Sequence, residues 1–350
     1  MSIFNYDHFL LLWIAIMGVI SSGAHIKVKE NVLGNEVERY NLVFALIVFA
    51  PIFLLASVWE VRGDVLQYLV NFDNASDNIH YIFKNWSNFQ DGQGFYAIEA
   101  LIKQIFGNNR DAFRIIIALM QSIPVVFVLR KYSENYIFSI FLFITYGFYN
   151  ACMMNALRQF IAVSLVFAAL PLLLKRKYVP FFVIVLIAIT IHKSAIIMIP
   201  FLLVSNLNFF SKKTWFLLIC ISIVVYIYMD RYAQFAEEII SVDDGSNPLR
   251  ILFSAIPIIL IFIRKDKIID NNNKLINICM NMSLITVLLF FVATFTSGVY
   301  VGRLPFYTNM YNMILLPYLV KTLFNSNEQK IITVILLLVF IVYFEVGFIL

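Results

Sequence analysis

Residues 155–200 read NALRQFIAVSLVFAALPLLLKRKYVPFFVIVLIAITIHKSAIIMIP, two long apolar runs separated by a short basic one. From Arg158 to Lys175 is 17 residues, or about 26 Å of α-helix at about 1.5 Å per residue. From Lys177 to His192 is 15 residues, or about 23 Å on the same rise. Both lengths are close to the thickness of a bilayer's hydrocarbon core. The spacing therefore predicts two membrane-spanning helices, with the basic triplet on one face and Arg158 and His192 on the other.

The whole chain repeats this arrangement. Of its 350 residues, 61% are hydrophobic and 13% are charged, whereas a soluble domain carries roughly twice that charged fraction. Open strands would leave backbone groups unpaired in lipid, so the spanning segments are expected to be helices. The sequence predicts an all-α polytopic membrane protein, a single transmembrane domain over residues 1–350. Basic cytoplasmic loops account for the net charge of +5, so no nucleic-acid partner is expected.

Apolar runs divide the chain into about twelve expected spans, and the basic residues between them give the orientation. One set of loops holds 16 of the 26 basic residues and the other set holds 10, so the positive-inside rule makes the first set cytoplasmic. Both termini then lie outside. One long helix over 178–210 would turn the basic loop at 264–274 outward, so two short spans that meet at His192 fit the rule better. The expected spans are 3–20, 41–58, 112–129, 135–152, 156–174, 178–191, 194–210, 214–229, 249–263, 275–297, 305–320 and 331–349.

Two long loops are expected on the outer face. Loop 59–113 interleaves aromatic and polar residues. This composition is typical of short amphipathic helices at the membrane interface, and it also suits an aromatic-lined cleft for a sugar chain; the two interpretations are compatible. Loop 230–248 is acidic and includes Asp243 and Asp244. Two adjacent acids in a Gly-Ser-Asn loop are usually solvated rather than metal-bound, and the four histidines show no ligand spacing, so no metal site is expected.

Three arginines each lie about one membrane thickness from a cytoplasmic basic residue, which places Arg114, Arg158 and Arg303 at outer helix mouths. Snorkelling to lipid head groups is one interpretation, but it fits Lys as well as Arg. Arg is preferred where a planar fork binds phosphate oxygens. Arg62, in Arg62-Gly63-Asp64, adds a fourth arginine beside a carboxylate.

Three groups could carry acid–base chemistry on the same face. His192 is the only histidine at an expected membrane mouth, where it suits a proton carrier or a phosphate donor, or simply ends a helix. Asp64 and Glu99 are the candidate carboxylates in loop 59–113. Glu345 lies within the last apolar run and is a functional candidate as an intramembrane carboxylate, although it lies only five residues from the C-terminus and can reach water.

Four ordered segments between about residues 40 and 320 resemble the EpsG-like family of bacterial exopolysaccharide and capsule proteins. That family is similar to the Wzy-type polymerases of O-antigen and capsule. The resemblance implies a multi-helix fold similar to that of GT-C glycosyltransferases. It also implies a polymerase that joins undecaprenyl-pyrophosphate-linked repeat units on the outer face of the inner membrane. The segments are Arg62-Gly63-Asp64 with Tyr68, Asn155-Ala156-Leu157-Arg158-Gln159 with Ala162, His192-Lys193-Ser194-Ala195, and Gly302-Arg303 with Tyr307.

The chemistry implied by this resemblance suits the residues present. A leaving pyrophosphate gains charge in the transition state, and fixed arginines can stabilise that charge without a metal or other cofactor. The acceptor sugar hydroxyl needs a base, for which Asp64, Glu99 and His192 remain open. Expected partners are the lipid-linked glycan donor and acceptor, membrane lipid and a chain-length regulator. The expected substrate and pyrophosphate ligands are Arg62, Arg114, Arg158, Arg303, Tyr68, Gln159 and Tyr307.

Two other classes of membrane protein stay open at this point. A flippase or transporter of lipid-linked glycan would line a path at mid-membrane depth with charged groups, whereas here the charges cluster at one face. A membrane O-acyltransferase of glycans would be expected to take its acyl donor from the cytoplasm, and no convincing inner-face His/Asp constellation is present.

The predicted topology is tested by labelling single cysteines from outside the cell, in a chain whose three native cysteines are replaced. Cysteines placed at Asn88 and Asn247 should react with an impermeant maleimide, because both lie in predicted external loops. A cysteine at Asn272 should not react. External labelling at Asn272 would overturn the twelve-span topology.

Overall fold

The computed structural model describes residues 5–23, 26–59, 61, 63–88, 91–205, 207–236, 245–270, 273–298 and 300–349, and most of them are helical. Arg62, Asp243 and Asp244 lie outside the described residues. The chain forms two compact units, Met1–Ile196 and Ile197–Leu350. They are called unit 1 and unit 2 below, and each is described by itself.

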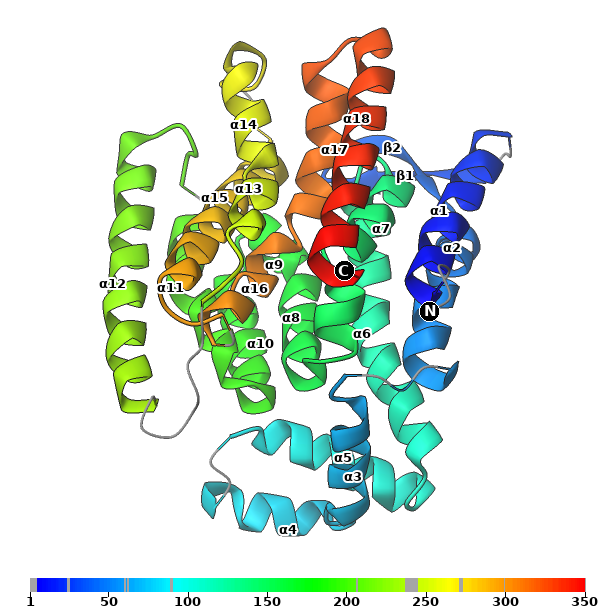
Figure 1. Cartoon of the computed structure of the whole chain (residues 1–350), viewed down its shortest axis with the longest axis vertical. Helices are drawn as coiled ribbons and strands as arrows, with labels where there is room; N and C mark the ends of the chain where they lie inside the picture. The colour runs from blue at the N-terminus through cyan, green and yellow to red at the C-terminus, as the bar shows by residue number, and fades with distance from the viewer. Residues whose placement is uncertain are drawn as a thin grey trace. The chain divides into compact units, whose positions relative to one another are not determined.

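Unit 1 consists of ten helices and a two-stranded hairpin within the described residues. The helices α6, α8 and α10 pack side by side, while α3, α4 and α5 gather near the start of α6 (Figure 1). Short π-helical turns at Leu55–Trp59 and Phe148–Met153 extend α2 and precede α8. The elements are α1 (Tyr6–Gly23), β1 (Lys27–Val32), β2 (Asn35–Tyr40), α2 (Leu42–Leu54), α3 (Val65–Asn74), α4 (Ile79–Lys84), α5 (Gln93–Phe106), α6 (Arg110–Tyr132), α7 (Tyr136–Thr145), α8 (Leu157–Ala168), α9 (Leu170–Leu174) and α10 (Tyr178–Ile191).

The regular secondary structure of unit 2 is helical in its described residues. Helix α15 is its most deeply buried long helix and packs against α11, α12, α13, α14, α16 and α17. A 3₁₀ turn at Val301–Arg303 leads into α16. The helices are α11 (Met198–Ser205), α12 (Lys212–Ala236), α13 (Leu249–Ser254), α14 (Ile256–Ile263), α15 (Lys274–Thr294), α16 (Phe306–Asn309), α17 (Asn312–Leu323) and α18 (Ser326–Phe344).

Asparagine caps explain where many of the helices begin. A side-chain oxygen at the N-cap accepts a hydrogen bond from an otherwise unpaired backbone N–H of the first turn. The asparagine before α18 also forms a capping box with Glu328. Proline accounts for two of the helix breaks, since Pro171 and Pro257 lie in the first turns of α9 and α14, where their missing N–H costs nothing. The capping residues are Asn41, Asn78, Asn109, Asn135, Asn273 and Asn325.

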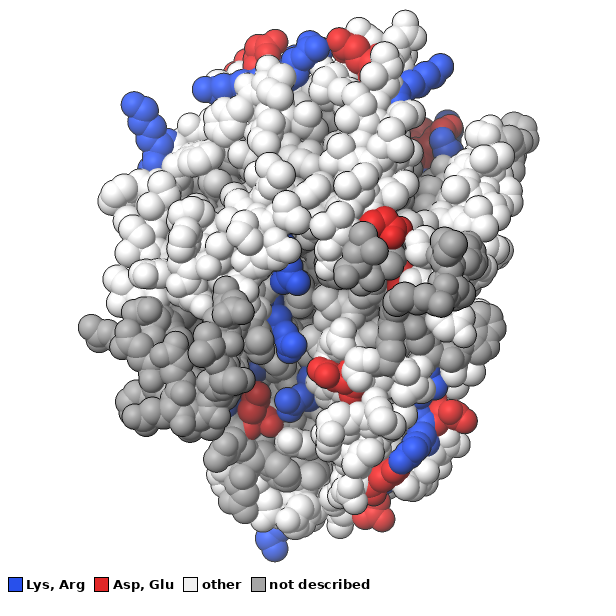
Figure 2. All heavy atoms as spheres, in the orientation of Figure 1, with Lys and Arg blue, Asp and Glu red and all other residues white. Residues whose placement is uncertain are grey.

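Four helices in the described part of the chain are long and apolar enough to cross a membrane: Arg110–Tyr132, Leu157–Leu174, Lys274–Thr294 and Ser326–Gly347. Five shorter apolar helices accompany them. Each of the twelve ranges expected to span contains helix. Figure 2 shows that uncharged side chains cover most of the face drawn, as expected for a surface that contacts lipid.

The α10 helix ends where the sequence predicts an interruption. Its last residue is Ile191, and His192 has an extended backbone with φ −151° and ψ 120°. A 3₁₀ turn, Lys193–Ile197, follows before α11 begins. The single long helix over 178–210 is therefore wrong.

The expected all-α fold is wrong at the hairpin of β1 and β2, whose residues were assigned to a basic cytoplasmic loop. The two strands pair antiparallel from Lys27 opposite Tyr40 to Val32 opposite Asn35. Leu33 and Gly34 both have positive φ, 56° and 91°, which is the backbone that a two-residue hairpin turn requires. The basic residues hid a weak alternation of polar and apolar side chains that could have predicted the strands.

Loop 59–113 is helical rather than irregular. Helix α3 buries Val65, Leu69 and Phe72 on one face, and α5 likewise buries one face. Both helices thus bury one face, and their place at the membrane interface stays a prediction. Acidic and basic side chains lie on the surface around α3–α5, at the bottom of the view in Figure 2.

The hairpin is held against the end of α6 by a partly buried ion pair. Arg130 Nε donates to Tyr40 O at 2.7 Å, and the same guanidinium pairs with Glu30. The Arg130 and Glu30 side chains are 10% and 31% exposed. A second pair, Lys29–Glu36, links the two strands but is 69% and 68% exposed.

These two pairs should differ in their contribution to stability. Glu30→Gln should lower the free energy of unfolding by about 1–3 kcal/mol, because the largely buried Arg130 guanidinium loses its charged partner. Glu36→Gln should lower it by less than about 1 kcal/mol, since exposed pairs are screened by water. Unfolding of the purified protein in detergent measures both values, and equal losses would contradict the docking role of Arg130.

Candidate functional site

A pocket of about 330 Å³ lies in unit 1 between α3, α5 and the start of α8. Four of the lining residues come from one face of α3: Asp64 at its N-cap, and Gln67, Tyr68 and Asn71 within the helix. Three more lie within two turns of α5, and the last is Arg158 from the first turn of α8. The lining residues are Asp64, Gln67, Tyr68, Asn71, Phe95, Tyr96, Glu99 and Arg158. The structure thus brings together Asp64, Tyr68, Glu99 and Arg158, all of which the sequence had singled out.

Asp64 occupies the N-cap position of α3, but its side chain makes no capping hydrogen bond. The residue is exposed and lines the pocket. Its backbone N–H donates to Asn155 Oδ1 at 3.2 Å. Gly63 has φ +57°, and a Cβ there would lie 1.9 Å from the same oxygen. Only glycine allows this approach, so Gly63-Asp64 and the segment that begins at Asn155 are in direct contact.

Among the described residues Arg158 forms no salt bridge, and its guanidinium lies against an aromatic ring and the backbone of Gly92. Its guanidinium carbon lies 5.9 Å from the centroid of the Phe95 ring. A Cβ on Gly92, which has φ +79°, would lie 2.6 Å from Arg158 Nη1. The Nε atom is buried, and no hydrogen-bond partner for it exists among the described residues. The guanidinium therefore retains donor capacity that no described residue uses and that an anionic ligand can take.

Glu99 is the buried carboxyl of the pocket, at 1% exposure. Neither carboxyl oxygen has a hydrogen-bond partner in the described part of the chain. Burial raises the pKa of Glu99 to about 7, while the charges of Arg158 and Lys103 oppose the rise. Lys103 is itself engaged, since its Nζ donates to the backbone oxygens of Asp73 and Ala75 at 2.9 and 2.8 Å. Glu99 can therefore gain or lose a proton near neutral pH.

His192 is not among the residues that line this pocket. Its Nδ1 lies 2.6 Å from Ser194 Oγ and accepts from the Ser194 backbone N–H at 3.4 Å. Because a backbone N–H can only donate, these contacts assign the imidazole proton to Nε2. Gln159 Nε2 donates to the same Ser194 Oγ at 3.2 Å. Ser194 thus links His192 to the residue that follows Arg158.

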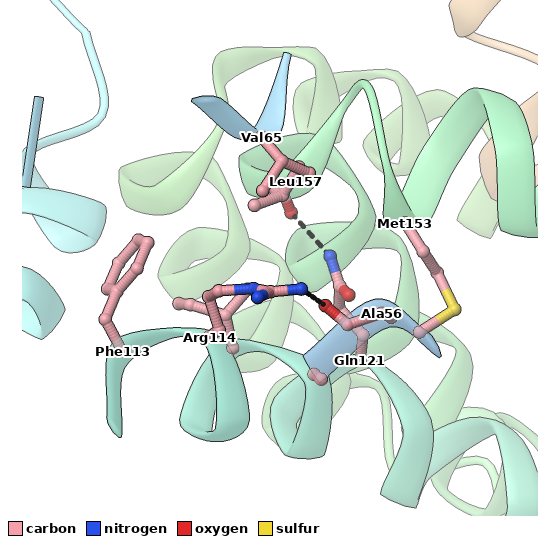
Figure 3. A pocket seen from close by; sticks show the side chains of 9 residues that line it. Ala56, Val65, Phe113, Arg114, Gln121, Met153 and Leu157 are labelled. Carbon is pink, nitrogen blue, oxygen red and sulfur yellow. Dashed lines mark hydrogen bonds between the residues drawn. The ribbon is translucent and has the colours of Figure 1, made fainter. Parts of the chain in front are cut away.

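Arg114 lies in a separate, small cavity of about 10 Å³. It donates to Val58 O at 3.0 Å and to Ala56 O at 3.5 Å, carbonyls of the π-helical turn that follows α2. Gln121, in the same cavity, donates to Leu157 O at 3.2 Å (Figure 3). The structure does not bring Arg114 into the pocket of Arg158; its guanidinium satisfies backbone carbonyls instead.

Arg303 and Tyr307 belong to unit 2. Arg303 ends the 3₁₀ turn before α16 and is partly exposed, whereas Tyr307 is 1% exposed. In the described residues, no three His, Cys, Asp or Glu side chains gather in a way that could hold a metal.

Three residues of the site were missed by sequence reasoning. Gln67 and Asn71 line the pocket, and Gln67 Nε2 donates to Asn71 Oδ1 at 2.9 Å. Their spacing of three and seven residues from Asp64 was a usable signal, because such residues share a helix face. Gly92 carried no such signal, since its role depends on the distant Arg158.

A family model described as "EpsG family" matches residues 41–350 of the chain. No curated protein and no solved structure matches the chain in the comparisons made. The matched range includes the whole pocket and the 3₁₀ turn that holds Arg303.

The raised pKa of Glu99 predicts a specific dependence of stability on pH. The folded state holds the Glu99 proton up to about pH 7, whereas the ordinary pKa is 4.5. Stability is therefore lost as pH rises through this window, and the difference corresponds to about 3 kcal/mol. Glu99→Gln should match the wild-type stability at pH 4 and exceed it by up to about 3 kcal/mol at pH 8. Unfolding measured at both pH values tests this.

Glu36→Gln, at an exposed site of the hairpin, is the control and should show no such pH-dependent gain. A Glu99→Gln variant that is no more stable than wild type at pH 8 would contradict the burial of an unpaired carboxyl.

Proposed function

Because the chain belongs to the EpsG family and is thus a membrane protein of polysaccharide biosynthesis, we propose that it is a polymerase. It joins undecaprenyl-pyrophosphate-linked oligosaccharide repeat units at the outer face of the bacterial inner membrane. The observation that carries this proposal is the pocket in which Arg158, which forms no salt bridge with a described residue, lies with a buried carboxyl, Glu99.

The remaining pocket residues suit a sugar. Gln67 and Asn71 offer amide donors and acceptors, and Asp64 offers a carboxylate that is not used as a helix cap. Tyr68 packs edge-on against Phe95 with ring centroids 5.9 Å apart, so one wall is aromatic. A small number of polar groups beside an aromatic wall can bind a carbohydrate and fix its orientation.

Arg158 is proposed to bind the pyrophosphate of the donor. As the bond between the anomeric carbon and the pyrophosphate oxygen breaks, the electron pair leaves with undecaprenyl pyrophosphate. Negative charge therefore grows on the leaving group, where a preorganised guanidinium stabilises it most. Because arginine supplies this charge, we propose that the transfer does not require a metal.

Glu99 is proposed as the base that takes the proton of the acceptor hydroxyl as the new glycosidic bond forms. A base is most effective when its pKa lies near the working pH, and burial brings Glu99 there. Asp64 is the second candidate, at the open side of the same pocket. His192 has its Nδ1 occupied by Ser194, so it is assigned a donor role through Nε2 rather than the role of base.

The remaining features of the proposal concern the membrane. Twelve spans with a GT-C-like arrangement would place loop 59–113, and therefore the pocket, outside the cell, where the lipid-linked repeat units are joined. Gln159 is proposed to position Arg158 through Ser194. Arg114 keeps a structural role, and a chain-length regulator is a proposed partner.

The proposed function is tested by the lipid-linked oligosaccharides of a strain that lacks this chain. The polymerase predicts single repeat units that accumulate on the outer face, with no long polymer. Single units accumulating on the inner face would indicate a flippase. Polymer of normal length that lacks acyl groups would indicate an O-acyltransferase. Either of the last two results would overturn the proposal.

Lysine at position 158 should not replace arginine. Arg158→Lys keeps the charge but loses the planar fork that binds phosphate oxygens at two points. We expect polymer made by the purified protein to fall by about tenfold or more, with thermal stability close to wild type. Wild-type polymer yield from Arg158→Lys would support interfacial snorkelling instead.

Gly92→Ala tests the position of the guanidinium without changing any charge. The new Cβ would displace Arg158 Nη1, which lies 2.6 Å away. Gly34→Ala, in the turn of the β1–β2 hairpin, is the matched control, because Gly34 also has positive φ, +91°, but nothing lies within 4 Å of a Cβ there. Both variants should lose a similar stability, about 1–3 kcal/mol from backbone strain. Only Gly92→Ala should also lose most of its polymer yield, and equal yields would contradict the role of this contact.

A further inference from the structure

Unit 2 contains an apolar groove of about 400 Å³ between α12 and α15. Its lining residues recur every three or four positions on each helix, so they form two facing stripes. Ser222 and Tyr226 carry the hydroxyls of the lining, and Ser222 Oγ donates to Leu218 O at 2.9 Å within its own helix. The other six lining side chains are hydrocarbon, so an apolar chain fits the groove. The lining residues are Ile219, Ser222, Ile223, Tyr226, Leu288, Phe291, Val292 and Phe295.

A corner that includes the Arg250 side chain adjoins the last turn of α15. Gly245 has φ +80°, and a Cβ there would lie 2.6 Å from Thr294 O. The Ser246 backbone N–H donates to Ala293 O at 2.9 Å. The segment 245–246 is therefore fastened to the same turn of α15 that ends the groove with Val292 and Phe295.

The other side of this corner is the 3₁₀ turn that carries Arg303. A Cβ on Gly302 would lie 3.5 Å from Ser246 Oγ and 3.8 Å from Arg250 Nη1. Ser246 is 5% exposed, and its Oγ has no hydrogen-bond partner among the described residues. The Arg250 guanidinium and the Ser246 hydroxyl thus both lie beside Gly302, and both are donors that suit phosphate oxygens.

From this juxtaposition we infer that unit 2 binds a prenyl pyrophosphate. The prenyl chain lies in the α12–α15 groove, and the pyrophosphate lies at Ser246, Arg250 and Arg303. The inference rests on the proposed function, because the donor and the acceptor of that reaction carry the same prenyl pyrophosphate. Arg250 and Ser246 are thereby assigned to binding. Lipid that merely surrounds the protein would occupy the groove without depending on Ser246, Arg250 or Arg303.

The test is photocrosslinking with the full-length protein in detergent. The probe is geranylgeranyl pyrophosphate with a diazirine on its chain, and the crosslinked peptides are identified by mass spectrometry. We expect crosslinks in 219–226 and 288–295. Unlabelled geranylgeranyl pyrophosphate should abolish them, whereas geranylgeraniol, which lacks the pyrophosphate, should not.

Two variants separate recognition of the pyrophosphate from contact with the prenyl chain of the ligand. Arg250→Gln should lower the groove crosslinks at least tenfold, and Ile223→Trp, which fills the groove, should do the same. The matched controls are Lys330→Gln, which removes an exposed basic charge elsewhere in unit 2, and Leu338→Trp, at an exposed position of α18. Both controls should crosslink as wild type does. Thermal unfolding of every variant identifies any loss that is due to misfolding.

Equal competition by geranylgeraniol, or unchanged crosslinks in Arg250→Gln, would show that the groove holds only surrounding lipid and would overturn the inference. If wild-type protein makes polymer while Arg250→Gln and Ile223→Trp crosslink as wild type does, the inference fails and the proposed function stands. If the groove crosslinks as expected but the strain lacking the chain still makes polymer, the proposed function fails and the binding site stands.

Discussion

The pocket of unit 1 depends on how closely the start of α5 approaches α8 and α10. A Cβ on Gly92 would meet Arg158 Nη1 at 2.6 Å, and a Cβ on Gly94 would meet Thr190 Oγ1 at 2.3 Å. Both positions require glycine for this packing. The two contacts bring Phe95 under the guanidinium and direct Glu99 toward the same pocket. The close packing of α5 thus places two of the three walls of the pocket, and α3 supplies the third with the side of the helix that is not buried.

A comparison of two arginines separates structure from function in this chain. The two terminal nitrogens of Arg114 donate to the carbonyls of Val58 and Ala56, and contacts of this kind with backbone stabilise a fold. Arg158 and Glu99 bury an Nε and two carboxyl oxygens without hydrogen-bond partners in the described residues. Buried polar groups without partners cost free energy. Their retention beside an open pocket is explained if a substrate supplies the missing partners.

Sequence reasoning located the helices and several of the residues that line the pocket of unit 1, but not their grouping. Apolar runs of membrane length predicted helix in every expected span, and the break at His192 followed from charge. Arg114 and Arg158 looked equivalent, because each lies one membrane thickness from a basic residue; only tertiary contacts distinguish them. The grouping of Asp64 with Glu99 depends on how α3 faces α5, which no local spacing specifies. The hairpin was missed because its charges resembled those of a loop.

The most direct measurement of the central claim is the pH dependence of polymer formation by purified protein supplied with lipid-linked repeat units in excess chelator. The account predicts full activity with chelator and a rate that rises with pH through about 7, the pKa of Glu99. Glu99→Gln should bind donor normally, lose this rise and react about 10²–10⁴-fold more slowly. Activity that requires added Mg²⁺, or a Glu99→Gln variant with the wild-type profile, would contradict it.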